Sequence, residues 1–143
     1  MKFYIATSNL NLDNILQSEC ILPPIHYSRR CSGYKTYEQL DELRSIESIV
    51  LFKYPVRFNI NDMGRYNFPM LIEFEDDSQT CDFSDKEIQS GVCLCGHRLN
   101  ITPKNCRIYF FNERAYKLTL VNTQSSKAIK YYNEYKIYPS TSM

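Results

Sequence analysis

The chain has 143 residues, which suits one domain, and its 43% hydrophobic share is enough for a core. Its 17 basic and 16 acidic residues leave a net charge of +1, which excludes a general electrostatic attraction to nucleic acid or membranes. No apolar run reaches about 18 residues and no apolar leader is visible, so we expect no membrane partner and a cytoplasmic domain. The domain is either the whole protein or the N-terminal part of a longer one.

The opening segment, residues 2–22, predicts a strand over 2–6, a polar turn and a short helix. The turn is made of small or polar residues, namely Ala6, Thr7, Ser8 and Asn9. Asn9 or Asn11 is expected to cap the helix by accepting from its free backbone N–H groups. A polar loop before a helix N-terminus suits an anion or a nucleotide, although most such loops only connect elements.

Residues 25–34 form a predicted loop after Pro23 and Pro24, which end the first helix. The loop carries groups that bind anions or stack on rings: His26, Tyr27, Arg29, Arg30 and Tyr34. It is either a binding loop or a solvated basic loop. A second helix is expected over 37–47, opened by the capping-box pattern Thr36-x-x-Gln39.

Most of the remaining chain alternates between apolar and polar residues or is rich in β-branched and aromatic residues. Strands are predicted over 48–54, 56–60, 69–75, 92–95, 106–111 and 115–121, with TCDF pairing back as a hairpin near 80–83. The last two strands are expected to be joined by a connection over 112–114. Ser84-x-x-Glu87 predicts a capped helical turn that ends at Gly91, and a last helix is expected over 125–135.

This order predicts an α+β fold with a mostly antiparallel split sheet, N-terminal helices and one C-terminal helix, because strands are grouped apart from helices. Two helices separate the first strand from the next, so we expect it to join the sheet out of sequential order. The predicted core consists of Ile5, Leu16, Leu40, Val50, Phe52, Leu71, Ile108, Phe110, Leu118 and Leu120.

The cysteines and histidines offer one weak metal constellation. Cys93, Cys95 and His97 stand two residues apart, with Cys81 and Cys106 on either side. Thiolate and imidazole suit zinc, but C-x-C-x-H departs from the usual ligand spacing. We therefore favour small buried thiols and a surface histidine over a zinc site, and nothing in the sequence sets a histidine beside a nucleophilic cysteine.

The segment YIATSNLNLDNIL, residues 4–16, resembles the start of ADP-ribosyltransferase folds, especially the nucleic-acid-modifying toxins of the DarT type. Those proteins begin with a strand, a turn bearing Thr or Ser, and a helix of the form N-L-x-x-I-L. Ala6 departs from the pattern, because the family often carries a His or a Gln-like residue there. The resemblance covers about twenty residues.

The resemblance implies binding of NAD or a related nucleotide, and modification of nucleic acid or protein. The implied cofactor-binding residues are Thr7, Ser8, Asn9, Tyr27, Arg29, Arg30 and Tyr34. Glu113 is the implied catalytic carboxylate, with Glu134 as an alternative. A different class stays open: a non-catalytic α+β recognition module whose tyrosines bind protein or single-stranded nucleic acid.

Overall fold

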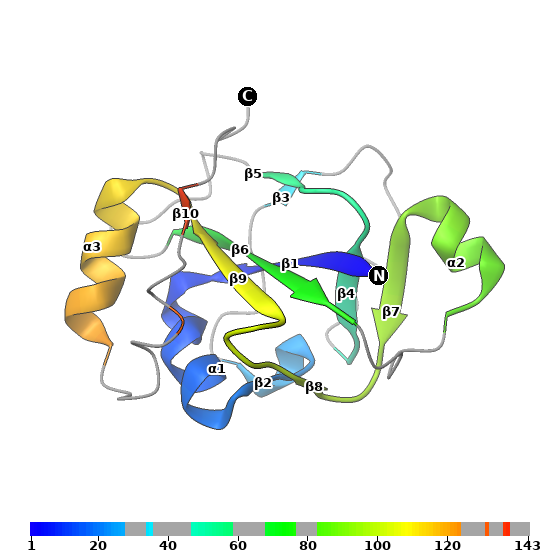
Figure 1. Ribbon diagram of the computed structural model, residues 1–143, viewed down its shortest axis with the longest axis horizontal. Helices are drawn as coiled ribbons and strands as arrows, with labels where there is room; N and C mark the ends of the chain where they lie inside the picture. Colours follow the sequence, from blue (N-terminus) through cyan, green and yellow to red (C-terminus); the bar gives the residue numbers. More distant parts are fainter. Residues whose placement is uncertain are drawn as a thin grey trace.

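A six-stranded sheet with strand order β10-β9-β6-β1-β4-β7 forms the centre of the computed structural model (Figure 1). The structure describes residues 1–27, 34–35, 47–58, 68–76, 83–123, 131 and 136–137. The six strands are β1 (Lys2–Ser8), β4 (Ile49–Phe52), β6 (Pro69–Glu75), β7 (Val92–Cys95), β9 (Cys106–Phe110) and β10 (Lys136–Ile137). Two small sheets pair β2 (Cys20–Ile21) with β8 (Leu99–Asn100), and β3 (Tyr34–Lys35) with β5 (Arg57–Phe58).

The helices of the described part are short. They are α1 (Leu12–Ser18), α2 (Asp85–Ser90), α3 (Glu113–Asn122) and the 3₁₀ turns η1 (Asn9–Asn11) and η2 (Pro24–His26). None of these helices is long and apolar enough to cross a membrane. Every described pairing in the large sheet is antiparallel except β9 with β10. The predicted α+β class and the split, mostly antiparallel sheet are therefore confirmed.

The strand predictions over 48–54, 69–75, 92–95 and 106–111 are confirmed as β4, β6, β7 and β9. β1 lies between β6 and β4, as expected for a strand that joins out of sequential order. The predicted helices over 37–47 and 125–135 and the hairpin near 80–83 lie outside the described residues, apart from Glu47, Tyr131 and Phe83.

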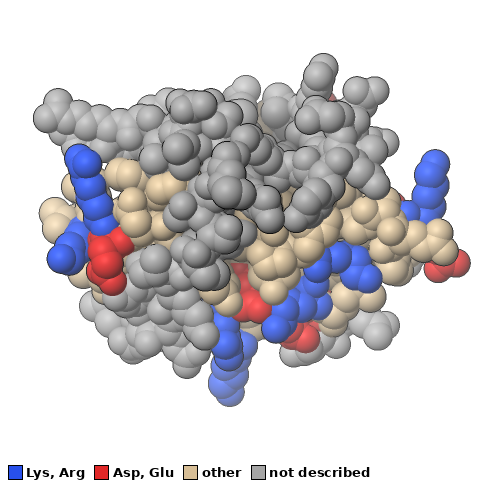
Figure 2. Space-filling view, turned by 90° about the horizontal axis from the view of Figure 1, so that it is seen from above, with Lys and Arg blue, Asp and Glu red and all other residues tan. Residues whose placement is uncertain are grey.

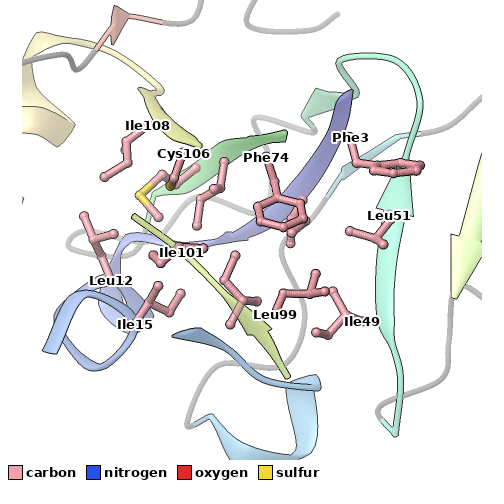
Figure 3. Packing of buried hydrophobic residues seen from close by; sticks show 14 of the residues in the cluster. Phe3, Leu12, Ile15, Ile49, Leu51, Phe74, Leu99, Ile101, Cys106 and Ile108 are labelled. Atoms are coloured by element: carbon pink, nitrogen blue, oxygen red, sulfur yellow. The ribbon is translucent and has the colours of Figure 1, made fainter. Parts of the chain in front are cut away.

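The sheet has a core on each face. The first face is covered by α1 and by the β2–β8 pair, so that Leu12, Ile15 and Leu99 pack against side chains of the sheet (Figure 3). The second face carries a smaller cluster around Phe52, Leu71 and Phe111. The predicted core residues that are buried are Ile5, Leu16, Phe52, Leu71, Ile108 and Phe110. Val50 and Leu118 are half-buried, and Leu40 lies outside the described residues.

The predicted connection over 112–114 and returning strand over 115–121 are wrong, because this segment is helix α3. Asn112 caps the helix, and its side chain accepts from the Ala115 N–H at 2.8 Å. Ala115 and Thr119, four residues apart, are buried, whereas Leu120 is 43% exposed although we expected it in the core. The alternation of apolar residues imitated a strand, but burial repeats with the period of a helix.

Candidate functional site

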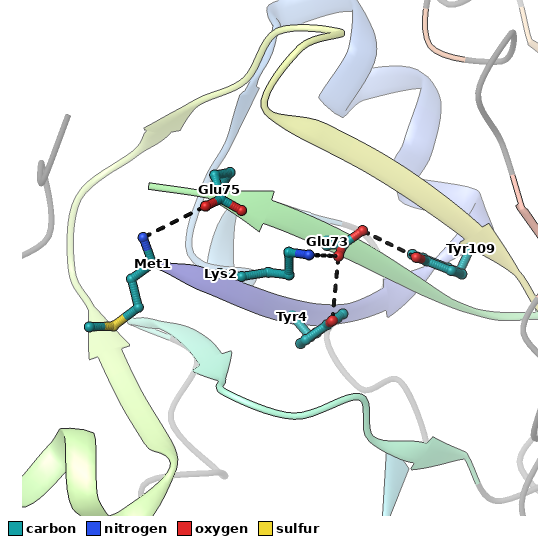
Figure 4. Close-up of polar contacts among 6 residues, drawn as sticks. All are labelled: Met1, Lys2, Tyr4, Glu73, Glu75 and Tyr109. Carbon is teal, nitrogen blue, oxygen red and sulfur yellow. Dashed lines mark hydrogen bonds and ion pairs between the residues drawn. The ribbon is translucent and has the colours of Figure 1, made fainter. Parts of the chain in front are cut away.

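A carboxylate, two phenols and an ammonium group meet on the second face of the sheet. We call Lys2, Tyr4, Glu73 and Tyr109 the Glu73 cluster (Figure 4). Tyr109 donates to one Glu73 oxygen at 3.1 Å, and Tyr4 donates to the other at 3.4 Å. Lys2 Nζ lies 3.0 Å from the oxygen that Tyr4 contacts.

Strand register brings these residues together. Tyr4 lies opposite Glu73 in the β1–β6 pair, and Glu73 lies opposite Arg107 in the β6–β9 pair. Successive side chains of a strand point to opposite faces, so Lys2 and Tyr4 share the face of Glu73, while Phe3 enters the other core. Three adjacent strands thus build the cluster.

The Glu73 carboxyl is held ionised. Glu73 is only 7% exposed, and this burial acts to raise its pKa. Hydrogen bonds from Lys2 and Tyr109, with the positive charges of Lys2 and Arg107, outweigh burial and leave the pKa of Glu73 lowered. Burial and the Glu73 charge raise the pKa of Tyr4 and Tyr109, so both phenols keep their protons and remain donors.

The cluster is reachable from solvent through its rim. The side chain of Lys2 is 53% exposed, Arg107 is exposed, and Tyr4 and Tyr109 are half-buried. Glu75 is the next residue of β6 on this face, and it lies 3.9 Å from the Met1 amine. In the view from above, basic residues in blue and acidic residues in red lie side by side near the lower centre of the molecule (Figure 2). A nearly buried anion beside two tyrosine rings suits an organic cation.

Thr7, Ser8 and Asn9, the predicted cofactor-binding turn, are buried. Thr7 and Ser8 belong to β1, so the strand runs two residues beyond the predicted end and the turn begins at Asn9. The Ser8 hydroxyl accepts from the Leu10 N–H at 3.1 Å, and the Thr7 hydroxyl accepts from the Asn11 amide at 3.1 Å. Asn11 occupies the N-cap position of α1, as one of the two alternatives predicted, but its side chain makes no cap hydrogen bond to the helix.

Asn9 connects the turn η1, to which it belongs, with the start of β6 and with α3. Its backbone N–H donates to the Phe68 carbonyl at 3.0 Å, and its side-chain oxygen accepts from the Phe68 N–H at 2.8 Å. Its amide nitrogen donates to the Thr119 hydroxyl of α3 at 3.1 Å. Asn9 therefore extends the β1–β6 ladder by one residue and ties it to α3.

The other predicted site residues lie apart in the chain. Tyr27 is buried, and its hydroxyl accepts from the Leu22 N–H at 2.9 Å. Tyr34 belongs to β3, and Glu113 is exposed in the first turn of α3. Arg29, Arg30 and Glu134 lie outside the described residues.

The described cysteines are buried thiols. They are Cys20, Cys93, Cys95 and Cys106, and Cys81 lies outside the described residues. Burial raises the pKa of Cys93 to about 11 and that of Cys106 to about 12. Cys95 Sγ lies 3.5 Å from His97 Nε2, so two members of the weak metal constellation are in contact. Among the described residues, no three metal-ligating side chains come together.

The Glu73 cluster was not predicted from the sequence. A signal existed, because Glu73 stands between Ile72 and Phe74 in a strand whose first four residues are all apolar. A carboxylate is rarely buried unless it is paired. Its partner Tyr109, 36 residues further along the chain, could not be identified without the strand order.

No protein-family model, curated protein sequence or solved structure matches this chain.

Proposed function

We propose that the protein is an ADP-ribosyltransferase-like domain that binds NAD, with the Glu73 cluster holding the nicotinamide end. In this proposal Glu73 takes the role of catalytic carboxylate that the resemblance assigned to Glu113. The single observation that carries it is the ionised, nearly buried Glu73 between two half-buried tyrosines.

The nicotinamide ring of NAD carries a positive charge, and this is the feature that the cluster recognises. An opposite charge about 4 Å away is worth about 4 kcal/mol at an effective dielectric constant of 20, before desolvation is subtracted. The faces of Tyr4 and Tyr109 add about 0.5–1 kcal/mol each where a cation lies over them. Such a site favours the oxidised, cationic dinucleotide over its reduced, neutral form.

The diphosphate of NAD requires cations beside this anion. Lys2 and Arg107 flank Glu73, and both reach solvent. When the nicotinamide ring neutralises Glu73, the Lys2 ammonium becomes available for a phosphate oxygen. Arg29 and Arg30 remain candidates for the same role, because a guanidinium fork contacts phosphate in bidentate fashion.

In the transfer reaction, the bond between nicotinamide and the ribose breaks, and the electron pair leaves with nicotinamide. The ribose becomes cationic in the transition state, and the ionised Glu73 stabilises that charge. A nucleophile of a nucleic acid or protein acceptor then bonds to the ribose and releases its proton to water. Glu73 stays ionised throughout.

Calorimetric titration with NAD and with NADH tests the proposal. We expect the wild type to bind NAD more tightly than NADH, and Glu73→Gln to weaken NAD binding at least tenfold, about 1.4 kcal/mol. The matched control is Glu75→Gln, which removes a carboxylate from the same strand and face but outside the cluster. Equal weakening by both variants, or wild-type preference for NADH, would contradict the proposal.

Transfer is tested separately with labelled NAD and mixtures of DNA, RNA and protein as acceptors. We expect label on one acceptor class with the wild type and none with Glu73→Gln. Binding of NAD without transfer to any acceptor would support a nucleotide-binding domain that lacks transferase activity.

A second candidate is a non-catalytic recognition module. The observation that favours it is the internal bonding of Thr7, Ser8 and Asn9, whose side chains complete the fold. Half-buried tyrosines on a sheet can stack on the bases of a single-stranded nucleic acid. Fluorescence anisotropy with labelled single-stranded DNA and RNA tests this, with Tyr109→Ala losing binding and Tyr109→Phe retaining it because the ring stays.

A further inference from the structure

The strand β7 ends the described sheet, and α2 lies outside it at that end of the molecule (Figure 1). An edge strand presents backbone groups that can pair with another chain. The β7 sequence, VCLC, contains neither a charge nor a proline that would discourage such pairing. Whether this edge can pair with another strand therefore depends on whether its outward N–H and C=O groups already have hydrogen-bond partners.

The register shows which backbone groups point outward. In an antiparallel pair, alternate residues turn both their N–H and C=O groups toward the partner strand. Lys53 donates to the Gly91 carbonyl at 2.9 Å, so Gly91 and every second residue after it face β4. Val92 and Leu94 thus direct their N–H groups away from the sheet.

Side chains of α2 occupy both of these donors. Glu87 accepts from the Leu94 N–H at 3.0 Å, and Ser90 accepts from the Val92 N–H at 3.2 Å. The Ser90 hydroxyl also lies 3.1 Å from the Val92 carbonyl oxygen. The helix that precedes the strand thus supplies the acceptors that a pairing strand would otherwise supply.

Glu87 uses its two oxygens for different purposes. One accepts from the Ser84 N–H at 3.3 Å and completes the capping box of α2, while the other contacts the Leu94 N–H. The same residue therefore fixes the start of the helix and occupies the edge. Gly91, with φ +80°, provides the reversal that returns the chain alongside its own helix.

We infer that Glu87 keeps the β7 edge from pairing with the β7 edge of a second copy of this chain. Without the carboxylate, the Leu94 N–H is free to take a carbonyl of a neighbouring strand as its acceptor. Two identical edges related by a twofold axis pair antiparallel, so that the carbonyl groups of each strand accept from the N–H groups of the other. The apolar residues of VCLC then meet across the new contact.

The test compares variants by size-exclusion chromatography with light scattering over a range of protein concentrations. We expect Glu87→Ala to assemble into a species at least twice the mass of the wild-type species, increasingly so at higher concentration. Glu87→Gln keeps an amide oxygen for Leu94 and is expected to match the wild type. Ser84→Ala is the matched control, because it removes the cap of α2 but leaves the contact between Glu87 and Leu94 in place.

Hydrogen exchange gives a second readout. At concentrations where Glu87→Ala is unassociated, we expect its Leu94 amide to exchange at least tenfold faster than in the wild type, and to regain protection on assembly. If Glu87→Ala fails to fold, Glu87→Asp serves instead, since it keeps the charge but shortens the reach by one methylene. Unchanged mass in the folded variant at every concentration, or assembly of Ser84→Ala to the same extent, would overturn the inference.

Discussion

Replacing Asn9 by Ala should destabilise the protein more than the small size of the Asn9 side chain suggests. Asn9 is 7% exposed, and its side chain holds the Phe68 N–H at 2.8 Å and the Thr119 hydroxyl at 3.1 Å. Alanine offers no acceptor, so the amide of Phe68, the residue before β6, is left buried without this hydrogen bond.

The expected magnitude follows from these two bonds. A buried donor left unsatisfied costs about 1–3 kcal/mol, and the lost hydrogen bond to Thr119 adds about 1 kcal/mol. We therefore expect Asn9→Ala to lower the free energy of unfolding by about 2–4 kcal/mol. For a chain of this length, this corresponds to a fall in Tm of about 3 °C per kcal/mol.

Urea unfolding followed by circular dichroism measures this loss. Thr119→Val is the matched control, because it removes the far end of the network and leaves the Phe68 amide bonded to Asn9. We expect it to cost about 1 kcal/mol, and the double variant to cost about 1 kcal/mol less than the sum of the two. A loss below 0.5 kcal/mol for Asn9→Ala, or one no larger than that of Thr119→Val, would refute the reasoning.

Three further predictions concern other parts of the fold. Gly91→Ala should cost about 1–2 kcal/mol in thermal or urea unfolding, since φ is +80° and the added Cβ would meet Tyr54 at 3.2 Å; a cost below 0.5 kcal/mol would contradict the left-handed turn. Leu120→Ser should change stability by less than about 0.5 kcal/mol while Ala115→Leu costs about 1–3 kcal/mol, and the reverse order would indicate a strand there. The pKa of Glu73 is lowered in the folded protein, so the stabilisation by its ionised carboxylate should be complete above the unfolded pKa of about 4.3 and lost as pH falls through the folded pKa. The free energies of unfolding of the wild type and Glu73→Gln should therefore converge in acid. A difference that does not change with pH would contradict this.

Several elements of the fold follow from short stretches of sequence. Ser84 and Glu87 predicted a capping box and Gly91 the end of its helix, and the structure contains all three. The strand predictions that became β4, β6, β7 and β9 rested on β-branched and aromatic runs. These features succeed because the interactions that decide them span only a few residues.

Burial and pairing between distant segments decided the rest. The segment 115–121 alternates like a strand, but the capped turn at Asn112 and the burial of Ala115 and Thr119 make it a helix. Thr7, Ser8 and Asn9 had the composition of a binding turn, yet contacts as distant as Thr119, 110 residues away, absorb their side chains. A short segment does not by itself determine which distant residues will pack against it.

The candidate site shows the same division. The sequence alone placed Glu73 inside a predicted strand. It also contains the other members of the cluster, namely Lys2, Tyr4 and Tyr109. Only the sheet order, with β6 between β1 and β9, brings Tyr4 and Tyr109 to the two oxygens of one carboxylate. Strand order depends on which faces bury the most apolar surface together, a property of the whole chain that no single segment determines.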